Sequence, residues 1–159
     1  MYPFYLSGVV VRGFRRGTPL GYPTANLESA ALPQAALERF EMRSYYGVAA
    51  LYGGNRVYRV AVSIGTNPSF GNALRTVEVH FLHRFGELFY GARIKVIILG
   101  FIRGMEKFAS LDALRRAIAA DSAVAGAALD DAALATYLSH PFFLGTPRCA
   151  RWRAGANAQ

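Results

Sequence analysis

The stretch GFRRGTPLGYPTAN, residues 13–26, combines residue types that bind phosphate and metal ions. Its glycines let backbone N–H groups approach an anionic ligand closely, and Arg15 and Arg16 add positive charge. Thr24 and Asn26 offer neutral oxygens to a magnesium ion that keeps its waters and takes its other ligands from nucleotide phosphates. Gly, Pro and Asn also form ordinary turns. The stretch therefore indicates either a nucleotide-binding loop or a purely structural turn.

A carboxylate lies in the middle of a second segment, RTVEVHF at residues 75–81. Alternation with period two places Glu78 on the face opposite Val77, Val79 and Phe81. If that face borders a pocket, Glu78 can act as a general base and accept a proton from a substrate hydroxyl. The alternative is a solvated glutamate on the outer face of a sheet.

Several other chemistries lack their residues. The chain has no G-x-x-x-x-G-K-[ST] phosphate loop, no dinucleotide fingerprint and no cysteine–histidine set for structural zinc. His80 and His83 are three apart on an expected strand, so they point to opposite faces and make a poor metal pair. Ser63 and Ser69 have no recognisable histidine base nearby in the pattern, which argues against a serine hydrolase.

Strand patterns occupy the first two thirds of the chain. Gly53 begins a four-residue turn between two of these strands, which predicts a hairpin. In the second strand of the hairpin, Tyr58, Val60, Val62 and Ile64 share a face that we expect in the core. The expected strands are 5–12, 46–52, 57–64, 75–83 and 93–102. The last of them becomes almost wholly apolar toward its end, so we expect that end to be buried.

Helical spacing follows. Ser110 is the expected N-cap, and Leu111, Leu114 and Ile118 recur at helical intervals. The alanine-rich stretch to about residue 138 favours one long helix or two short ones, ended by Pro141. Residues 28–42 fit a short helix or a loop equally well. Strands followed by terminal helices predict a compact antiparallel barrel or sandwich closed by a helix.

Composition limits the class of protein. A chain of 159 residues with 53% hydrophobic and 18% charged residues fits one globular domain. No apolar run reaches the roughly 18 residues of a membrane-spanning helix, and the lone Cys149 cannot form an internal disulfide. We expect the cytoplasm, with an organelle as the alternative. The formal charge of +8 suits an anionic partner: nucleic acid, a membrane surface or a phosphorylated small molecule.

The ordered motifs resemble those of the riboflavin kinase (flavokinase) family. They are G-x-V-V-x-G, RG, LG-x-PTAN, SIG-x-NP, TVEVH, FYG, LGFIR and E-x-F-x-SL, at residues 8–13, 16–17, 20–26, 63–68, 76–80, 89–91, 99–103 and 106–111. The resemblance implies a six-stranded antiparallel Greek-key barrel with one or more C-terminal helices. It also implies transfer of the γ-phosphoryl group of ATP to the ribityl 5′-hydroxyl of riboflavin, giving FMN and ADP.

The resemblance also implies roles for particular residues. Thr24 and Asn26 would hold the metal–nucleotide complex, and Glu78 would deprotonate the attacking hydroxyl. The metal would be Mg²⁺ or another divalent cation such as Zn²⁺ or Mn²⁺. The further ATP-binding residues would be Gly13, Arg16 and Gly17, and the flavin-binding residues would be Asn67, Arg103 and Phe108.

The expected organisation is one riboflavin kinase domain over residues 1–159, with a motif-bearing core at about 4–121 and a helical, polar extension at about 122–159. Since the chain has no room for an adenylyltransferase domain, we expect its chemistry to stop at FMN. We expect a monomer that binds riboflavin and ATP, without nucleic-acid or membrane partners. Two alternatives remain: a basic β-barrel that binds RNA or single-stranded DNA, and a flavin-binding protein without catalysis.

Overall fold

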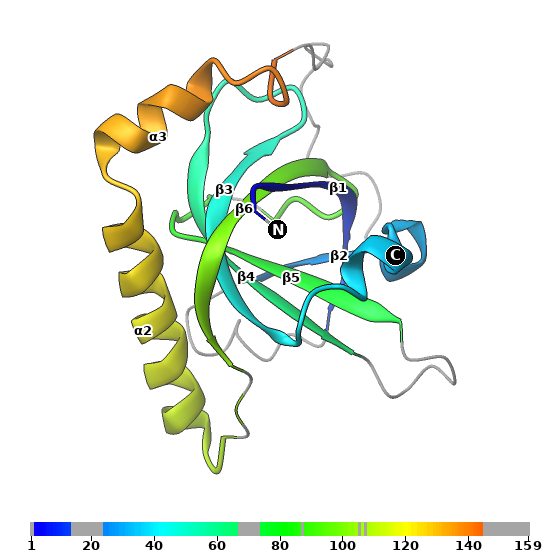
Figure 1. Ribbon diagram of the computed structural model, residues 1–159, viewed down its shortest axis with the longest axis vertical. Coiled ribbons are helices and arrows are strands. Elements are labelled where there is room, and N and C mark those ends of the chain that lie inside the picture. Colours follow the sequence, from blue (N-terminus) through cyan, green and yellow to red (C-terminus); the bar gives the residue numbers. More distant parts are fainter. Residues whose placement is uncertain are drawn as a thin grey trace.

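A computed structural model describes residues 2–13, 24–66, 74–86, 88–104, 106 and 108–144 of the chain. Six strands form a closed barrel in the order β1-β2-β5-β4-β3-β6, and every neighbouring pair is antiparallel (Figure 1). The strands are β1 Phe4–Val11, β2 Thr24–Leu27, β3 Arg43–Leu51, β4 Tyr58–Thr66, β5 Arg75–Phe81 and β6 Arg93–Gly104. The predicted six-stranded antiparallel barrel is confirmed.

The hairpin and the core follow the period-two pattern. β3 and β4 pair as predicted, and Gly53 in the turn has a φ of 79°, a conformation that glycine adopts without strain. The side chains of Val60, Val62 and Ile64 have exposed fractions of 0% and lie in the main core cluster. Because successive side chains point to opposite faces, the residues between them lie on the outside of the barrel.

The end of β6 corrects one expectation. Its apolar run is buried at Ile97 and Ile98, but Phe101 is 44% exposed. The partner strand β3 shifts register at Ser44/Tyr45 and again at Tyr46/Gly47, which breaks regular alternation opposite this part of β6. The Phe101 ring instead lies 4.9 Å from the guanidinium carbon of Arg43. An apolar run alone therefore overstated the burial.

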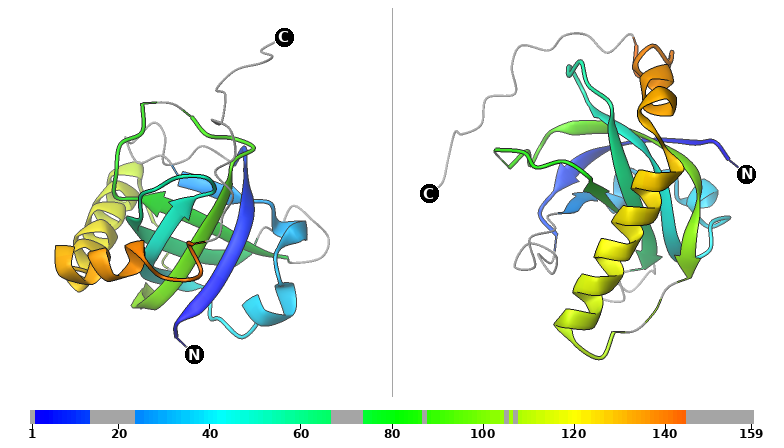
Figure 2. Two further views of the ribbon diagram at one scale, coloured as in Figure 1. Left: turned by 90° about the horizontal axis from the view of Figure 1, so that it is seen from above. Right: turned by 90° about the vertical axis from the view of Figure 1, so that its left-hand side faces the viewer.

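Residues 28–42 form two short helices, the 3-10 helix η2 Ser29–Ala31 and α1 Gln34–Leu37. They lie on the side of the barrel away from the long C-terminal helix (Figure 2). The Gln34 carboxamide accepts from the backbone N–H of Arg75 at 2.8 Å and donates to the Arg75 carbonyl at 3.2 Å. Leu37 and Phe40 are 0% and 2% exposed in the core cluster. These contacts fix the segment to the barrel.

The C-terminal region contains two helices, α2 Leu111–Ala128 and α3 Asp131–Leu138. The predicted cap is confirmed, because the Ser110 hydroxyl accepts from the Ala113 N–H at 3.1 Å. α2 packs across β3, β4 and β6 (Figure 1). The helix is buried at Asp121 and Ala125, in its second half, whereas Leu111 in the first turn is 65% exposed. The apolar spacing therefore identified the helix but not the residues that it buries.

Arg59 on β4 ties the junction of the two helices to the barrel. Its Nε donates to the Leu129 carbonyl at the end of α2 at 2.5 Å, and its terminal nitrogen pairs with Asp131 of α3 at 2.6 Å. A cation there satisfies carbonyls that the helix end leaves without partners. Across the described part of the chain, no helix combines the length and the hydropathy needed to cross a bilayer.

Candidate active site

Strand pairing brings five side chains into one line across the outer surface of the barrel. Each of them is the register partner of the next one on the neighbouring strand. We call this line the transverse row: Asn26 on β2, Glu78 on β5, Ser63 on β4, Ser44 on β3 and Arg103 on β6. On β2, β5 and β4 the residues beside them in the sequence, among them Val77 and Val79, point into the core. The row therefore brings together residues far apart in the chain.

The residues that the sequence analysis placed at the metal and at the base are neighbours. The Thr24 hydroxyl donates to the Glu78 carboxylate, with 3.5 Å between Oγ1 and Oε2. Asn26 is the direct register partner of Glu78, and all three side chains are half-buried. TANL is strand β2, so at these positions the turn alternative is wrong.

Gly13 lies against Asn26. A Cβ atom added to Gly13 would overlap the carboxamide of Asn26. Any other residue at position 13 would displace that side chain, which explains the glycine by close approach. The other predicted ATP-binding residues, Arg16 and Gly17, lie outside the described residues, as does the predicted flavin-binding residue Asn67.

An aromatic cavity of about 160 Å³ opens beside Thr24. Phe81, Phe85 and Phe89 form its wall, with ring centroids 4.8 to 5.7 Å apart. Its lining residues are Val10, Thr24, Ala25, Phe81, His83, Phe85, Gly86, Leu88, Phe89 and Tyr90. The sequence pattern did not indicate this cavity. Its signal was the four-residue spacing of the three phenylalanines after Glu78, which crowd the end of one strand with rings.

A positive charge lies at the same cavity. The guanidinium carbon of Arg12, at the end of β1, is 5.6 Å from the ring centre of Tyr90. Arg12 is exposed, and Tyr90 lines the cavity. A ligand that places a ring among the phenylalanines would therefore meet a cation outside.

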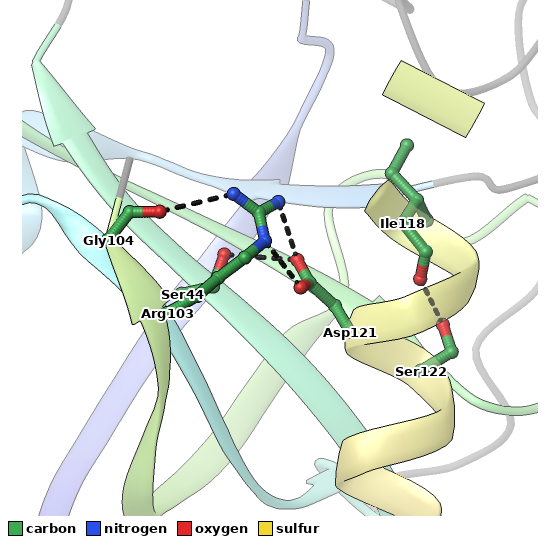
Figure 3. A network of polar contacts seen from close by, with 6 residues as sticks. All are labelled: Ser44, Arg103, Gly104, Ile118, Asp121 and Ser122. Atoms are coloured by element: carbon green, nitrogen blue, oxygen red, sulfur yellow. Dashed lines mark hydrogen bonds and ion pairs between the residues drawn. The ribbon is translucent and has the colours of Figure 1, made fainter. Parts of the chain in front are cut away.

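Two predicted flavin-binding residues meet at the other end of the transverse row. The guanidinium of Arg103 lies 5.4 Å from the centre of the Phe108 ring. It also pairs with both carboxylate oxygens of Asp121 on α2, at 2.7 and 2.9 Å (Figure 3). The Ser44 hydroxyl donates to the same carboxylate at 3.1 Å. Asp121 was missed because an acidic residue on an alanine-rich helix is ordinarily solvent-exposed.

The oxygens near Glu78 fit a loosely held divalent ion better than a closed metal site. Within the described ranges, no group of three or more His, Cys, Asp or Glu side chains is arranged to hold a metal. Thr24 and Asn26 contribute a hydroxyl and a carboxamide beside one carboxylate. Such a set suits Mg²⁺, which usually keeps several waters and takes further ligands from substrate phosphates.

A larger open groove of about 430 Å³ lies elsewhere, between β1, β6 and α3. Its lining residues are Tyr2, Pro3, Tyr5, Leu99, Thr136, Tyr137 and His140. None of the predicted site residues is among them. The smaller aromatic cavity, in contrast, adjoins Thr24.

Comparison with known proteins identifies the family. The sequence profile of the flavokinase family, described as riboflavin kinase, matches residues 1–129. Riboflavin kinase of Mus musculus is 40% identical over 129 residues, covering 80% of this chain and 82% of the relative. The bifunctional riboflavin kinase/FMN phosphatase of Arabidopsis thaliana is 38% identical over 88% of this chain, but the chain spans only 37% of that relative's length.

A solved structure agrees. The crystal structure of riboflavin kinase from Trypanosoma brucei is similar with a TM-score of 0.67 and 34% identity, covering 89% of this chain and 86% of that chain. The closed barrel, the helix packed on it and the match to the family profile together place this protein in the flavokinase class. The chain belongs to the riboflavin kinase family and is an enzyme of that family. The resemblance inferred from the ordered motifs is confirmed, and the family supports phosphorylation of riboflavin to FMN.

Proposed function

We propose that this protein transfers the γ-phosphoryl group of ATP to the 5′-hydroxyl of riboflavin, with Glu78 as the general base. One observation carries the proposal beyond the family: Glu78 lies beside Thr24 and Asn26, between an aromatic cavity and the Arg103–Phe108 pair. A phosphoryl transferase needs alignment of two substrates and neutralisation of charge more than it needs covalent chemistry. This arrangement offers two substrate sites on either side of one carboxylate.

The nucleotide would occupy the side of Thr24. The aromatic cavity suits the flat base of ATP, and Arg12 lies where the anionic part of such a ligand could reach it. Thr24 and Asn26 would hold the divalent ion with the phosphates. When bound, Mg²⁺, or Zn²⁺ or Mn²⁺ in its place, would neutralise charge on the phosphates. Gly13 allows the backbone to approach at this point, and Arg16 and Gly17 are proposed to contact the phosphates from the same stretch.

Riboflavin would lie along the exposed part of the transverse row, outside Ser44, which is buried against Asp121 of α2. Glu78 and Arg103 are separated by three strand spacings, or about 14 Å along the curved sheet. The isoalloxazine ring would lie at Arg103 and Phe108, with Asn67 as a further contact, and the ribityl chain would run past Ser63 toward Glu78. An aromatic wall with few polar groups suits such a ring.

The chemical step is then a single displacement. The 5′-hydroxyl oxygen of riboflavin attacks the γ-phosphorus while a Glu78 oxygen accepts its proton. The bond from the γ-phosphorus to the oxygen that bridges it to the β-phosphate breaks, and ADP leaves with that electron pair. General-base assistance of this kind is worth about 10²- to 10⁴-fold in rate.

The test is formation of FMN by the purified protein. Riboflavin, ATP and Mg²⁺ are supplied together, and the products are separated by chromatography. FMN and ADP should appear in equal amounts, and chelation of the metal should abolish both. Riboflavin that is bound but not converted would instead indicate a flavin-binding protein. A mobility shift of labelled single-stranded DNA, with neither riboflavin binding nor FMN formation, would indicate a nucleic-acid binder.

A further inference from the structure

Asp121 and Ser44 are the buried polar or charged side chains among the described residues, at 6% and 2% exposed, and they bind one another. A buried carboxylate is costly unless it is paired and hydrogen-bonded. Asp121 meets this condition by accepting two hydrogen bonds from Arg103 and one from Ser44 (Figure 3). The network joins α2 to β6 and β3 at one point.

Arg103 keeps part of its hydrogen-bonding capacity inside this network. A guanidinium has five N–H donors. Among the described residues it uses two for Asp121 and one, at 3.1 Å, for the Gly104 carbonyl. Two N–H groups on the terminal nitrogens therefore remain, the side chain is 24% exposed, and one flat face lies over Phe108.

Stability alone is a weak reason for such a network. A buried ion pair is often no more stabilising than packed apolar side chains of the same volume. What the two carboxylate contacts do provide is a fixed orientation, because the planar fork of arginine matches a carboxylate at both oxygens. The orientation matters here because Arg103 ends the row that begins at Glu78 and Asn26.

We infer that Asp121 and Ser44 are positioning residues for the flavin. They hold the Arg103 guanidinium so that its two remaining N–H groups and the Phe108 ring form one surface for the polar edge and the face of the isoalloxazine ring. The inference rests on the proposed function, which puts riboflavin in the transverse row. It assigns to α2 a role in substrate binding that the helix pattern did not indicate.

The test separates the ring from the rest of the substrate. Lumiflavin, which has the ring without the ribityl chain, is titrated by fluorescence, and MgADP by calorimetry. Asp121→Asn keeps the shape but removes the charge, and it should weaken lumiflavin binding about tenfold or more while MgADP binding stays within about twofold. Ser44→Ala should act in the same direction with a smaller effect. The same variants should raise KM for riboflavin and leave KM for ATP unchanged.

The matched control is Ser122→Ala. Ser122 follows Asp121 on α2, but its hydroxyl donates to the Ile118 carbonyl of its own helix at 2.8 Å. Ser122→Ala should therefore leave the binding of lumiflavin and of MgADP unchanged. Melting temperatures of all variants, measured without ligand, report separately on folding.

A double-mutant cycle tests whether Asp121 acts through Arg103. Arg103→Met should itself weaken the binding of lumiflavin, and adding Asp121→Asn to that variant should then change the lumiflavin affinity little further. Three results would overturn the inference. The first is an equal loss of lumiflavin affinity on adding Asp121→Asn in both backgrounds, and the second is a parallel loss of MgADP affinity. The third is unchanged lumiflavin binding and riboflavin KM in Asp121→Asn. FMN production with an unaffected Asp121→Asn variant defeats only this inference. A wild-type protein that neither binds riboflavin nor makes FMN defeats the proposed function itself.

Discussion

Replacing Glu78 by Gln removes a negatively charged proton acceptor and keeps the size and shape of the side chain. The side chain is half-buried on the outer face of β5, and a carboxamide oxygen can still accept the hydroxyl hydrogen of Thr24. Since the volume and this contact are kept, the free energy of unfolding should change by no more than about 0.5 kcal/mol. Turnover should fall by about 10²- to 10⁴-fold, the usual value of a general base. That range equals about 2.7 to 5.4 kcal/mol of transition-state stabilisation.

The assay follows FMN formation at saturating riboflavin and MgATP. The loss should be in kcat, with KM for both substrates and the affinity for MgADP close to wild type, because the base acts in the transition state. Glu38→Gln is the control, since Glu38 is an exposed carboxylate beside α1. A folded Glu78→Gln protein that keeps more than about a tenth of wild-type kcat would refute the assignment of the base. Loss of MgADP binding would point instead to a ligand role for the carboxylate.

Three further predictions concern packing and pH. Gly13→Ala should lower the free energy of unfolding in urea by about 1–3 kcal/mol and weaken the binding of MgATP, because its Cβ overlaps the Asn26 carboxamide. Gly104→Ala, whose Cβ meets no atom within 4 Å, is the control, and equal losses would contradict the packing argument. Gly126→Ala in α2 should stabilise the protein by about 0.5–1 kcal/mol and raise Tm, since its Cβ makes an ordinary 3.8 Å contact; a lower Tm would exclude this. Burial raises the pKa of Tyr45 above its usual 10.0, so stability should fall as pH rises through about 10, where only the unfolded chain ionises. Tyr45→Phe should flatten this fall in unfolding measured from about pH 8 to about pH 11, and an unchanged slope would reject the cause.

Local patterns predicted most of the barrel. Alternation in β4 and β5 identified buried valines because one face of each strand packs in the core and the other does not. Ser110 marked the start of α2 because capping depends on adjacent residues only. The same locality explains the errors. Exposure of Phe101 depends on shifts in the partner strand, and exposure of Leu111 depends on where α2 meets the barrel.

The candidate site was predicted from motifs, whereas the buried network beside it was missed because folding brings its members together. Thr24, Asn26 and Glu78 belong to ordered motifs, and the structure brings them together. Asp121 has no such mark, because its partners Arg103 and Ser44 are 18 and 77 residues away in the chain. The pairing of a buried carboxylate appears only when the helix is laid across the strands.

The four-residue strand β2 has a consequence for how the protein responds to its own substrates. It joins β1 through two residue pairs and β5 through three, and it is the shortest strand in the described part of the barrel. β2 is therefore the weakest link in the closed barrel, and it carries Thr24 and Asn26. In the proposed function a nucleotide binds Thr24 and Asn26 only when β2 is paired, so it stabilises this pairing by an amount that grows with the nucleotide concentration. At a high concentration of ATP, β2 should therefore stay paired with β1 and β5.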